Sequence, residues 1–222
     1  MLSIFLVLAA FAFALLWLGS EVLEGDTFAI DRSILLGLRS AADVSNPVGP
    51  GWLLYSMTDA TALGSVTVLT LVTIIVVGYL VATMRLSAAV FVSIAVIGGA
   101  LLSSGLKSLF FRARPDVVPH LMHVSSASFP SGHAMNSAVV YLTLATLLAR
   151  TEPKERVRIY LLTVAISLAV LVGVSRVYLG VHWPSDVIAG WCVGAIWAAS
   201  CSLVGKALLR HRAIESVATS DD

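Results

Sequence analysis

The sequence predicts an all-α integral membrane protein, a single domain over residues 1–222 built as a bundle of six transmembrane helices. Composition is the first reason: 58% of the residues are hydrophobic and 12% are charged, with a mean hydropathy of +0.94, whereas soluble domains carry about 25% charged residues. The second reason is that the apolar residues form six runs of about 20, the helix length that crosses a bilayer. No internal repeat and no soluble domain interrupts these runs, and a polar tail, 213–222, follows them.

The first apolar run, Leu2–Leu18, is expected to be a retained span. No Lys or Arg precedes it and no small-x-small cleavage site follows it, so it lacks the marks of a cleaved signal peptide. Residues 27–39 come next and are amphipathic, with four apolar side chains on one helical face: Ile30, Ile34, Leu35 and Leu38. Asp31, Arg32 and Arg39 fall off that face. This pattern suits a helix at the membrane surface, and equally a short helix packed on the bundle.

Five further spans are expected after a turn-rich linker at residues 46–51: Ala60–Met84, Leu86–Leu106, His133–Leu148, Ile159–Val177 and Pro184–Leu209. Small residues in the span after Arg85 allow close helix packing. Two of the connecting loops carry unusual chemistry, a long polar loop at 107–130 and a short loop at 178–183.

The distribution of Lys and Arg predicts the orientation of the spans. If the spans alternate, eight of the 14 basic residues fall on one side: Arg85, Arg150, Lys154, Arg156, Arg158, Lys206, Arg210 and Arg212. The positive-inside rule makes that side cytoplasmic, together with the C-terminus. Both loops of unusual chemistry then lie on the extracytoplasmic face of a cell membrane.

Several classes of site are not predicted. The net charge of +1 says nothing about nucleic acid, and no basic tract of the nucleic-acid-binding type occurs, so nucleic acid is not an expected partner. Cys192 and Cys201 are nine residues apart in one apolar segment, about 13 Å along a helix, which is too far for a disulfide. No C-x-x-C or H-E-x-x-H motif is present, so we expect neither a metal nor another cofactor.

The four residues P-S-G-H, Pro130–His133, stand directly before an apolar helix. Ser131 is suited to cap that helix, and Gly132 lets backbone N–H groups approach a ligand closely. A helix N-terminus favours anions, and a histidine such as His133 can move a proton near neutral pH. Taken alone, the stretch is more simply explained as a helix cap.

Two other segments should reach the same face, Lys107–Pro115 and Ser175–Asp186. With P-S-G-H they supply three cations at the ends of spans: Lys107, Arg114 and Arg176. Placing cations near a membrane is costly, so three of them indicate a polyanionic partner. Phosphate fits, because Arg donates two parallel hydrogen bonds to it and Lys adds a point charge.

Of the two histidines in these segments, His182 is the better nucleophile. Pro184 suits the first position of a helix, which puts Asp186 four residues after His182 and able to orient its ring. The other ring nitrogen is then free to attack phosphorus, and His133 is left to protonate the leaving group. Ser131, Gly132 N–H and the cations would hold the transition-state oxygens, a scheme that needs no metal.

Each residue alone has a simpler explanation. Arg114 and Arg176 suit interfacial snorkelling, Asp186 suits a helix cap, and His182 suits an ordinary loop; the combined pattern favours a site. His120 and His123 match no part of it and are expected to be loop residues, with substrate contact as the alternative. Arg112 and Asp116 flank the first segment as candidates for electrostatic support.

The three segments resemble the motifs of the type 2 phosphatidic acid phosphatase superfamily. They read Lys, six residues, Arg-Pro; then P-S-G-H; then Ser-Arg, five residues, His, three residues, Asp, over a motif core of 107–186. The resemblance implies a phosphohistidine on His182 oriented by Asp186, with His133 as acid. It also implies a phosphate site formed by Lys107, Arg114, Ser131, Gly132 and Arg176.

The resemblance implies a metal-independent membrane lipid phosphatase. A polyprenyl diphosphate such as undecaprenyl diphosphate is the preferred substrate, with phosphatidylglycerophosphate or phosphatidic acid as alternatives. Two other classes stay open: a phosphotransferase to a lipid or sugar acceptor, and a non-catalytic anion-binding or lipid-binding membrane protein. The sequence predicts no oligomeric state.

Overall fold

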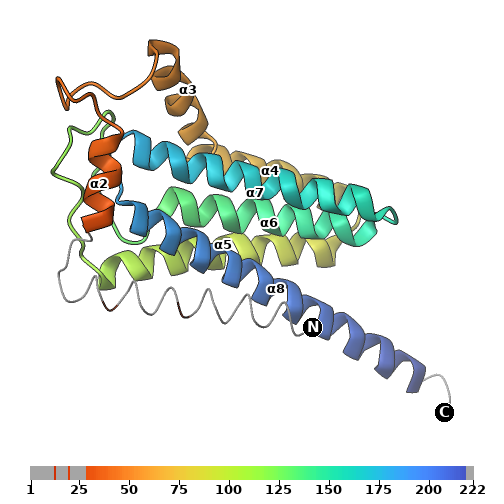
Figure 1. The fold of residues 1–222 in the computed structure, drawn as a ribbon. Helices are drawn as coiled ribbons and strands as arrows, with labels where there is room; N and C mark the ends of the chain where they lie inside the picture. Colours follow the sequence, from red (N-terminus) through yellow and green to blue (C-terminus); the bar gives the residue numbers. More distant parts are fainter. Residues whose placement is uncertain (1–12, 14–19, 21–28, 219–222) are drawn as a thin grey trace.

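The computed structural model describes residues 13, 20 and 29–218, with side chains to residue 207, and the regular secondary structure of this part of the chain is helical (Figure 1). Seven helices are described: α2 Ala29–Gly37, α3 Gly51–Ala62, α4 Val66–Ala82, α5 Leu86–Leu109, α6 Gly132–Thr151, α7 Glu155–Tyr178 and α8 Pro184–Ala218. The only pairing of extended backbone in these residues is an isolated bridge between Arg39 and Pro47. The predicted all-α class is therefore confirmed for the described residues.

Among the described residues, four helices are long and apolar enough to cross a membrane: α5, α6, α7 and residues Pro184–Ala207 of α8. A fifth candidate span is the pair α3 and α4, which is bent by 47°. The prediction of six spans is not confirmed, because its first span, Leu2–Leu18, lies almost wholly outside the described residues.

The predicted continuous span Ala60–Met84 is wrong at its start, because the helix breaks between α3 and α4. Ser65 caps α4, its Oγ accepting a hydrogen bond from Val68 N at 3.2 Å. Tyr141 on α6 donates to the Leu63 carbonyl oxygen at 2.7 Å and so holds the break against the bundle. The Val68 N–H and the Leu63 carbonyl oxygen thus have side-chain partners, so α3 and α4 can end and begin here without forming one continuous helix.

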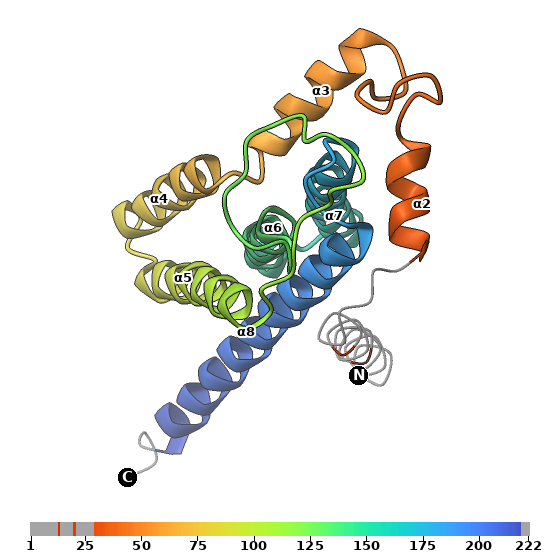
Figure 2. The same cartoon turned by 90° about the vertical axis from the view of Figure 1, so that its left-hand side faces the viewer.

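Helix α6 lies at the centre of the bundle, and Figure 2 shows α4, α5, α7 and α8 around it. Two glycines of α8 let that helix pack directly on the α6 backbone. A Cβ atom added to Gly190 would meet the Ser131 carbonyl oxygen at 2.8 Å, and one added to Gly194 would meet the Met135 carbonyl oxygen at 2.6 Å. Small residues at such contacts let helix backbones approach each other.

Helix α2 packs on the bundle, the second of the two predicted arrangements. Leu35 is fully buried as expected, but Ile30 and Ile34 on the predicted apolar face are 65% and 41% exposed. Asp31 and Arg39, which were predicted to lie off the buried face, are buried, at 1% and 4% exposed. Asp31 has polar partners there, including Ser185 N at 2.9 Å. Arg39 Nη1 donates to the Tyr178 carbonyl oxygen at 2.9 Å, while its Nε and Nη2 have no partner among the described residues.

The three motif segments meet at one end of the bundle, as alternating spans require. The ends of α5 and α7 and the starts of α6 and α8 lie at this end, and the loop 110–131 crosses it (Figure 2). Backbone hydrogen bonds fix the loop there, from Leu121 N to Leu179 O and from Ser128 N to Arg112 O, each at 3.0 Å. Ser131 N donates to Asp186 O at 3.0 Å, which joins the second segment to the third.

Candidate active site

His182 and Asp186 form a buried pair at the junction of α7 and α8. Gly180, with φ of +73°, makes the turn after α7, and Pro184 begins α8 as its sequence position suggested. The side chain of His182 is 2% exposed and that of Asp186 is 0% exposed. His182 Nδ1 lies 3.4 Å from Asp186 Oδ2, so the carboxylate faces that ring nitrogen.

Ser128 links the two members of this pair, a role the sequence analysis missed. Its Oγ donates to Asp186 Oδ2 at 2.5 Å and lies 3.3 Å from His182 Nδ1. The backbone N–H of Trp183 donates to the same Oδ2 at 3.0 Å. Ser128 stands outside the three motifs, and only its place two residues before Pro130 hinted at proximity to the site.

The environment of His182 keeps its imidazole neutral. Burial lowers the pKa of His182 to about 4, while the hydrogen bond and negative charge of Asp186 partly oppose the decrease. At neutral pH the ring therefore has one nitrogen that carries hydrogen and one that carries a lone pair. With Nδ1 facing the Asp186 carboxylate, Nε2 is the nitrogen available for attack.

Arg112 bridges two buried carboxylates next to the histidine. Its Nη1 donates to Asp186 Oδ1 at 2.6 Å and its Nη2 donates to Asp31 Oδ2 at 3.1 Å. Asp31 also accepts from Ser185 N at 2.9 Å, and from Ser185 Oγ. The guanidinium lies 5.6 Å from the centre of the Trp183 ring. Arg112 was predicted only as electrostatic support, and nothing in the sequence pairs Asp31 with a residue 154 positions away.

Arg114 lies against the open side of the imidazole. Its Nη1 is 3.4 Å from His182 Nε2 and donates to the Val181 carbonyl oxygen at 2.5 Å. Ser126 fixes the rest of the guanidinium, accepting from Nε at 2.8 Å and from Nη2 at 3.2 Å. Burial lowers the pKa of Arg114, opposed by the charge of Asp186. A phosphoryl group held by Arg114 would therefore face Nε2.

Lys107 and Arg176 supply the other two cations. Lys107 Nζ donates to the Ala127 carbonyl oxygen at 2.6 Å, and its Cε would lie 3.3 Å from a Cβ atom added to Gly132. Arg176 is 2% exposed, and its Nη1 donates to Thr61 Oγ1 at 3.1 Å and contacts Met122 Sδ at 2.8 Å. Its Nε is buried and has no partner among the described residues.

Ser131 occupies the N-cap position of α6, but the prediction that its side chain caps the helix is wrong. The hydroxyl makes no capping hydrogen bond, and its buried Oγ has no partner in the described part of the protein. The Ser131 backbone N–H is held by Asp186 O instead. Buried polar groups normally have partners, so the free groups of Ser131 and Arg176 are available to a ligand.

His133 begins α6 beside these groups and is partly buried. It interacts electrostatically with the three cations and with His182. The break between α3 and α4 lies against it, because a Cβ atom added to Gly64 would come within 3.3 Å of the His133 carbonyl oxygen.

The side chains of the remaining sequence candidates share no hydrogen bond with this cluster in the described part of the chain. His120 is exposed and its Nε2 contacts the Pro115 carbonyl oxygen at 2.7 Å, as expected for a loop residue, and His123 and Asp116 are exposed. Ser175 is buried and donates within its own helix, to Val172 O at 2.6 Å. Within the described residues, no group of three His, Cys, Asp or Glu side chains could hold a metal ion.

Comparison with known proteins places this arrangement in a family. Residues 88–210 match the sequence profile described as the PAP2 superfamily. Phosphatidylglycerophosphatase B of Bacillus subtilis is 48% identical over 99 residues, which are 43% of this chain and 47% of that protein. Undecaprenyl-diphosphatase of Sulfolobus acidocaldarius is 48% identical over 68 residues, 31% of this chain and 29% of that protein. The chain thus spans about half or less of the length of these two relatives.

A solved structure matches over a greater length. The transmembrane PAP2 type phosphatidylglycerolphosphate phosphatase from Bacillus subtilis superposes with a TM-score of 0.79 at 30% identity, covering 90% of this chain and 96% of that one. LpxE of Aquifex aeolicus superposes with a TM-score of 0.60 at 26% identity, covering 78% of this chain and 95% of that one. The matched profile covers more than half of the sequence and includes every motif residue, and the chain therefore belongs to the PAP2 superfamily.

Proposed function

We propose that this protein is an integral membrane lipid phosphatase that removes phosphate from a lipid monoester or diphosphate through a phosphohistidine on His182. The proposal rests on the neighbours of the two nitrogens of that imidazole. Asp186 faces Nδ1 at 3.4 Å, while Nε2, on the other side of the ring, lies 3.4 Å from Arg114 Nη1. A neutral imidazole oriented on one side and next to a phosphate-binding cation on the other is suited to nucleophilic attack.

The reaction proceeds in two steps. In the first, His182 Nε2 forms a bond to phosphorus and the bond from phosphorus to the lipid oxygen breaks. His133, protonated when the phosphate anion binds beside it, gives its proton to that oxygen. In the second, water attacks the phosphohistidine and loses its proton to His133. Inorganic phosphate leaves and both histidines return to their starting states.

The cations and the free donors form the proposed phosphate site. Lys107, Arg114 and Arg176 offset the charge that develops on the equatorial oxygens of the transition state. The unpaired Ser131 Oγ and Arg176 Nε supply further hydrogen bonds, and Gly132 leaves room for the backbone to approach. These donors are fixed by the fold before substrate binds, so little reorganisation accompanies the reaction.

Two classes of lipid substrate have support from the relatives. A polyprenyl diphosphate such as undecaprenyl diphosphate is supported by the undecaprenyl-diphosphatase relative. Phosphatidylglycerophosphate is favoured by the phosphatidylglycerolphosphate phosphatase structure, because that protein is matched over 96% of its length. Phosphatidic acid is a further candidate. The same phosphohistidine would also serve a phosphotransferase, in which a lipid or sugar hydroxyl replaces water.

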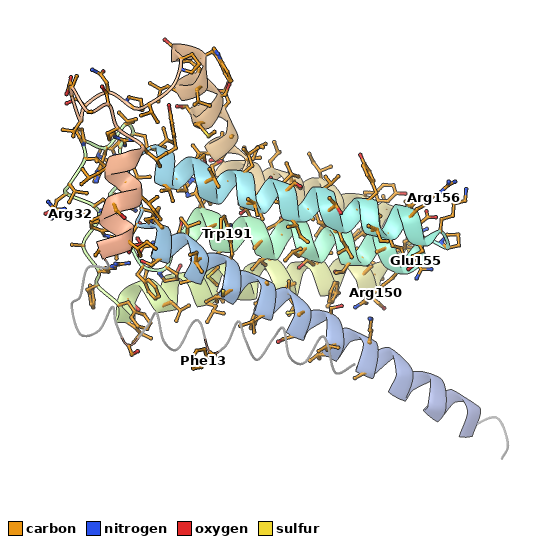
Figure 3. All side chains as sticks on the ribbon, viewed as in Figure 1. Phe13, Arg32, Arg150, Glu155, Arg156 and Trp191 are labelled. Atoms are coloured by element: carbon orange, nitrogen blue, oxygen red, sulfur yellow. The ribbon has the colours of Figure 1, made fainter. Side chains whose placement is uncertain are left out.

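The proposed orientation places the site on the extracytoplasmic face and the C-terminus in the cytoplasm. Its support is the basic loop at the end of the bundle away from the site, where Figure 3 labels Arg150 and Arg156. Lipid would enter laterally between helices near the site, with α2 and its exposed Ile30 and Ile34 beside the entry. Labelling of single cysteines at position 123 and position 156 with a membrane-impermeant reagent tests this orientation, and labelling of position 156 alone on intact cells would overturn it.

The test of function is phosphate release by the purified protein. The panel contains a polyprenyl diphosphate, phosphatidylglycerophosphate, phosphatidic acid and soluble sugar phosphates, each compared in wild type, His182→Ala and His120→Ala proteins. Release from at least one lipid, lost in His182→Ala and kept in His120→Ala, supports the proposal. Turnover retained by a folded His182→Ala protein refutes the mechanism, and labelled phosphate recovered on an added acceptor identifies a phosphotransferase.

A further inference from the structure

A groove lies at the end of the bundle opposite His182, between α5, α6 and α8. Its volume is about 780 Å³, within the range of about 300–1,000 Å³ that is usual for ligand sites. Apolar side chains of α5 and α8 form most of its wall, including Val90, Phe91, Ile94, Trp197 and Val204. Leu86–Ile94 covers eight helical steps, about 12 Å, so the groove runs from the end of the spans toward the middle of the membrane.

Arg150 stands at the outer end of this groove with part of its guanidinium unpaired. Nη2 donates to Ser202 O at 2.8 Å and to Ser202 Oγ at 2.9 Å, which fixes the side chain between α6 and α8. The guanidinium also lies 5.1 Å from the centre of the Phe91 ring. Its Nε is buried and has no hydrogen-bond partner among the described residues. A buried charged donor without an acceptor is unfavourable, and an anionic oxygen in the groove would satisfy it.

The groove is therefore charged at one end and apolar along the rest of its length, as a phospholipid is. Its charged end, at Arg150 and Thr151, coincides with the end of the spans, and its apolar end, at Ile94 and Trp197, lies deeper. Basic pockets between transmembrane helices are a known form of lipid head-group site. We infer that one anionic glycerophospholipid binds here, with its phosphodiester on Arg150 and an acyl chain along α5 and α8.

This lipid site is separate from the proposed phosphatase site. The two lie at opposite ends of α6, which begins next to His133 and ends at Thr151. The bound lipid therefore belongs to the leaflet opposite His182. The lipid would add to the contacts of Arg150 with Ser202 and Phe91, which connect α6 to α8 and α5 at this end of the bundle.

Photolabelling tests the inference. The full-length protein is placed in phosphatidylcholine nanodiscs containing phosphatidylglycerol with a diazirine on one acyl chain, and labelled peptides are identified by mass spectrometry. We expect labelling within residues 86–94 and 197–205. Arg150→Gln should reduce it about tenfold, because a charge-assisted hydrogen bond is lost.

Arg150 also holds α8 through Ser202, so Arg150→Gln could reduce labelling by disturbing helix packing. A second variant separates this effect from lipid binding. Gly205→Leu removes neither partner of that contact. Its Cβ would lie 3.4 Å from Phe91 and 3.8 Å from Arg150 Nη1, both ordinary contact distances, so the larger side chain fills the groove beside the guanidinium. It should reduce labelling as strongly. Two matched controls should label like wild type: Arg156→Gln, an exposed basic residue at the same end (Figure 3), and Gly78→Leu, an exposed glycine on α4 with no atom within 4 Å of an added Cβ.

Two results would overturn the inference. Equal labelling by phosphatidylcholine carrying the same diazirine would mean that the groove holds only bulk bilayer lipid. Labelling unchanged in both Arg150→Gln and Gly205→Leu would mean that the labelled lipid lies elsewhere.

Discussion

Arg112 donates a 2.6 Å hydrogen bond to Asp186 and, from its other terminal nitrogen, a 3.1 Å hydrogen bond to Asp31. One cation therefore holds the carboxylate that faces His182 and ties it to α2, a helix outside the three motifs. The side chains of both partners of Arg112 are at most 2% exposed. The position of Asp186 thus depends on how α2 docks.

Asp31→Asn should lower kcat by about tenfold or more, because it weakens one charge-assisted contact of the guanidinium that holds Asp186. KM should change little, since Asp31 does not touch the phosphate site. Steady-state kinetics on the best lipid substrate measure this separation. The control is Asp43→Asn, an exposed carboxylate in the loop after α2, and equal kinetics in the two variants would remove Asp31 from this role.

Arg112→Gln should be more damaging than Asp31→Asn, because it leaves two buried carboxylates without their shared cation. Loss of one partner of a buried ion pair costs about 3–5 kcal/mol. We expect a lower Tm in detergent and a loss of activity, with partial recovery in Arg112→Lys. A Tm equal to that of wild type would show that the two carboxylates do not need the cation for folding.

Ser128→Ala should reduce kcat by about tenfold, because Asp186 Oδ2 loses its 2.5 Å donor and the imidazole loses a neighbour at 3.3 Å. Ser126→Ala is the matched control. That residue lies in the same loop and loses only an exposed 3.2 Å contact with Arg114, so its kcat should stay within about twofold of wild type. Equal losses in the two variants would point to a general disturbance of the loop.

His182 should stay neutral down to about pH 4. Its pKa falls from an ordinary 6.5 to about 4 in the folded protein, because burial disfavours the charged ring. The unfolded chain then binds more protons between these values, so the His182 contribution to stability is complete above about pH 6.5 and is lost as the pH falls toward 4. Nitrogen-15 NMR of labelled histidine, assigned with His182→Ala, reads the protonation directly, and titration near pH 6.5 would contradict the expectation.

Activity should persist in excess chelator, because in the proposed site Lys107, Arg114 and Arg176 supply the positive charge that the phosphate requires. The measurement is phosphate release before and after dialysis against EDTA. Loss of release that Mg²⁺ restores would count against direct attack by the histidine without metal assistance.

Gly194→Ala should destabilise the bundle, because the added Cβ would meet the Met135 carbonyl oxygen at 2.6 Å and the Ala138 side chain at 2.8 Å. Overpacking of this kind costs about 1–3 kcal/mol. Gly78→Ala is the control, since nothing lies within 4 Å of its added Cβ. Thermal unfolding should show a lower Tm in the first variant alone.

The sequence was sufficient for the all-α class and for the meeting of the three motifs at one end of the bundle. Both follow from simple rules, since apolar runs of bilayer length become helices and alternating helices bring every second loop to the same end. The position of Asp186 relative to His182 was also predictable, because four residues across a helix start is a local spacing.

The parts that could not be predicted depend on contacts between distant residues. Asp31 faces Ser185 across 154 positions, and Ser128 reaches Asp186 across 58. The amphipathic pattern of α2 predicted the wrong buried face for the same reason. Asp31 is buried because it bonds to Arg112 and Ser185, which are distant in sequence, while Ile30 is exposed. The bend between α3 and α4 was missed because hydropathy does not distinguish a broken helix from a continuous one.

Gly190 and Gly194 let the α8 backbone lie close against α6, and this close packing contributes to the spacing of the two histidines. His133 begins α6 and His182 stands just before α8, so in the proposed site the separation of the two imidazoles follows from how these two helices pack on each other. The lipid-facing surface can then vary without moving either imidazole. A change in which lipid the protein accepts therefore requires changes along the approach to the site, while the reacting groups keep their separation.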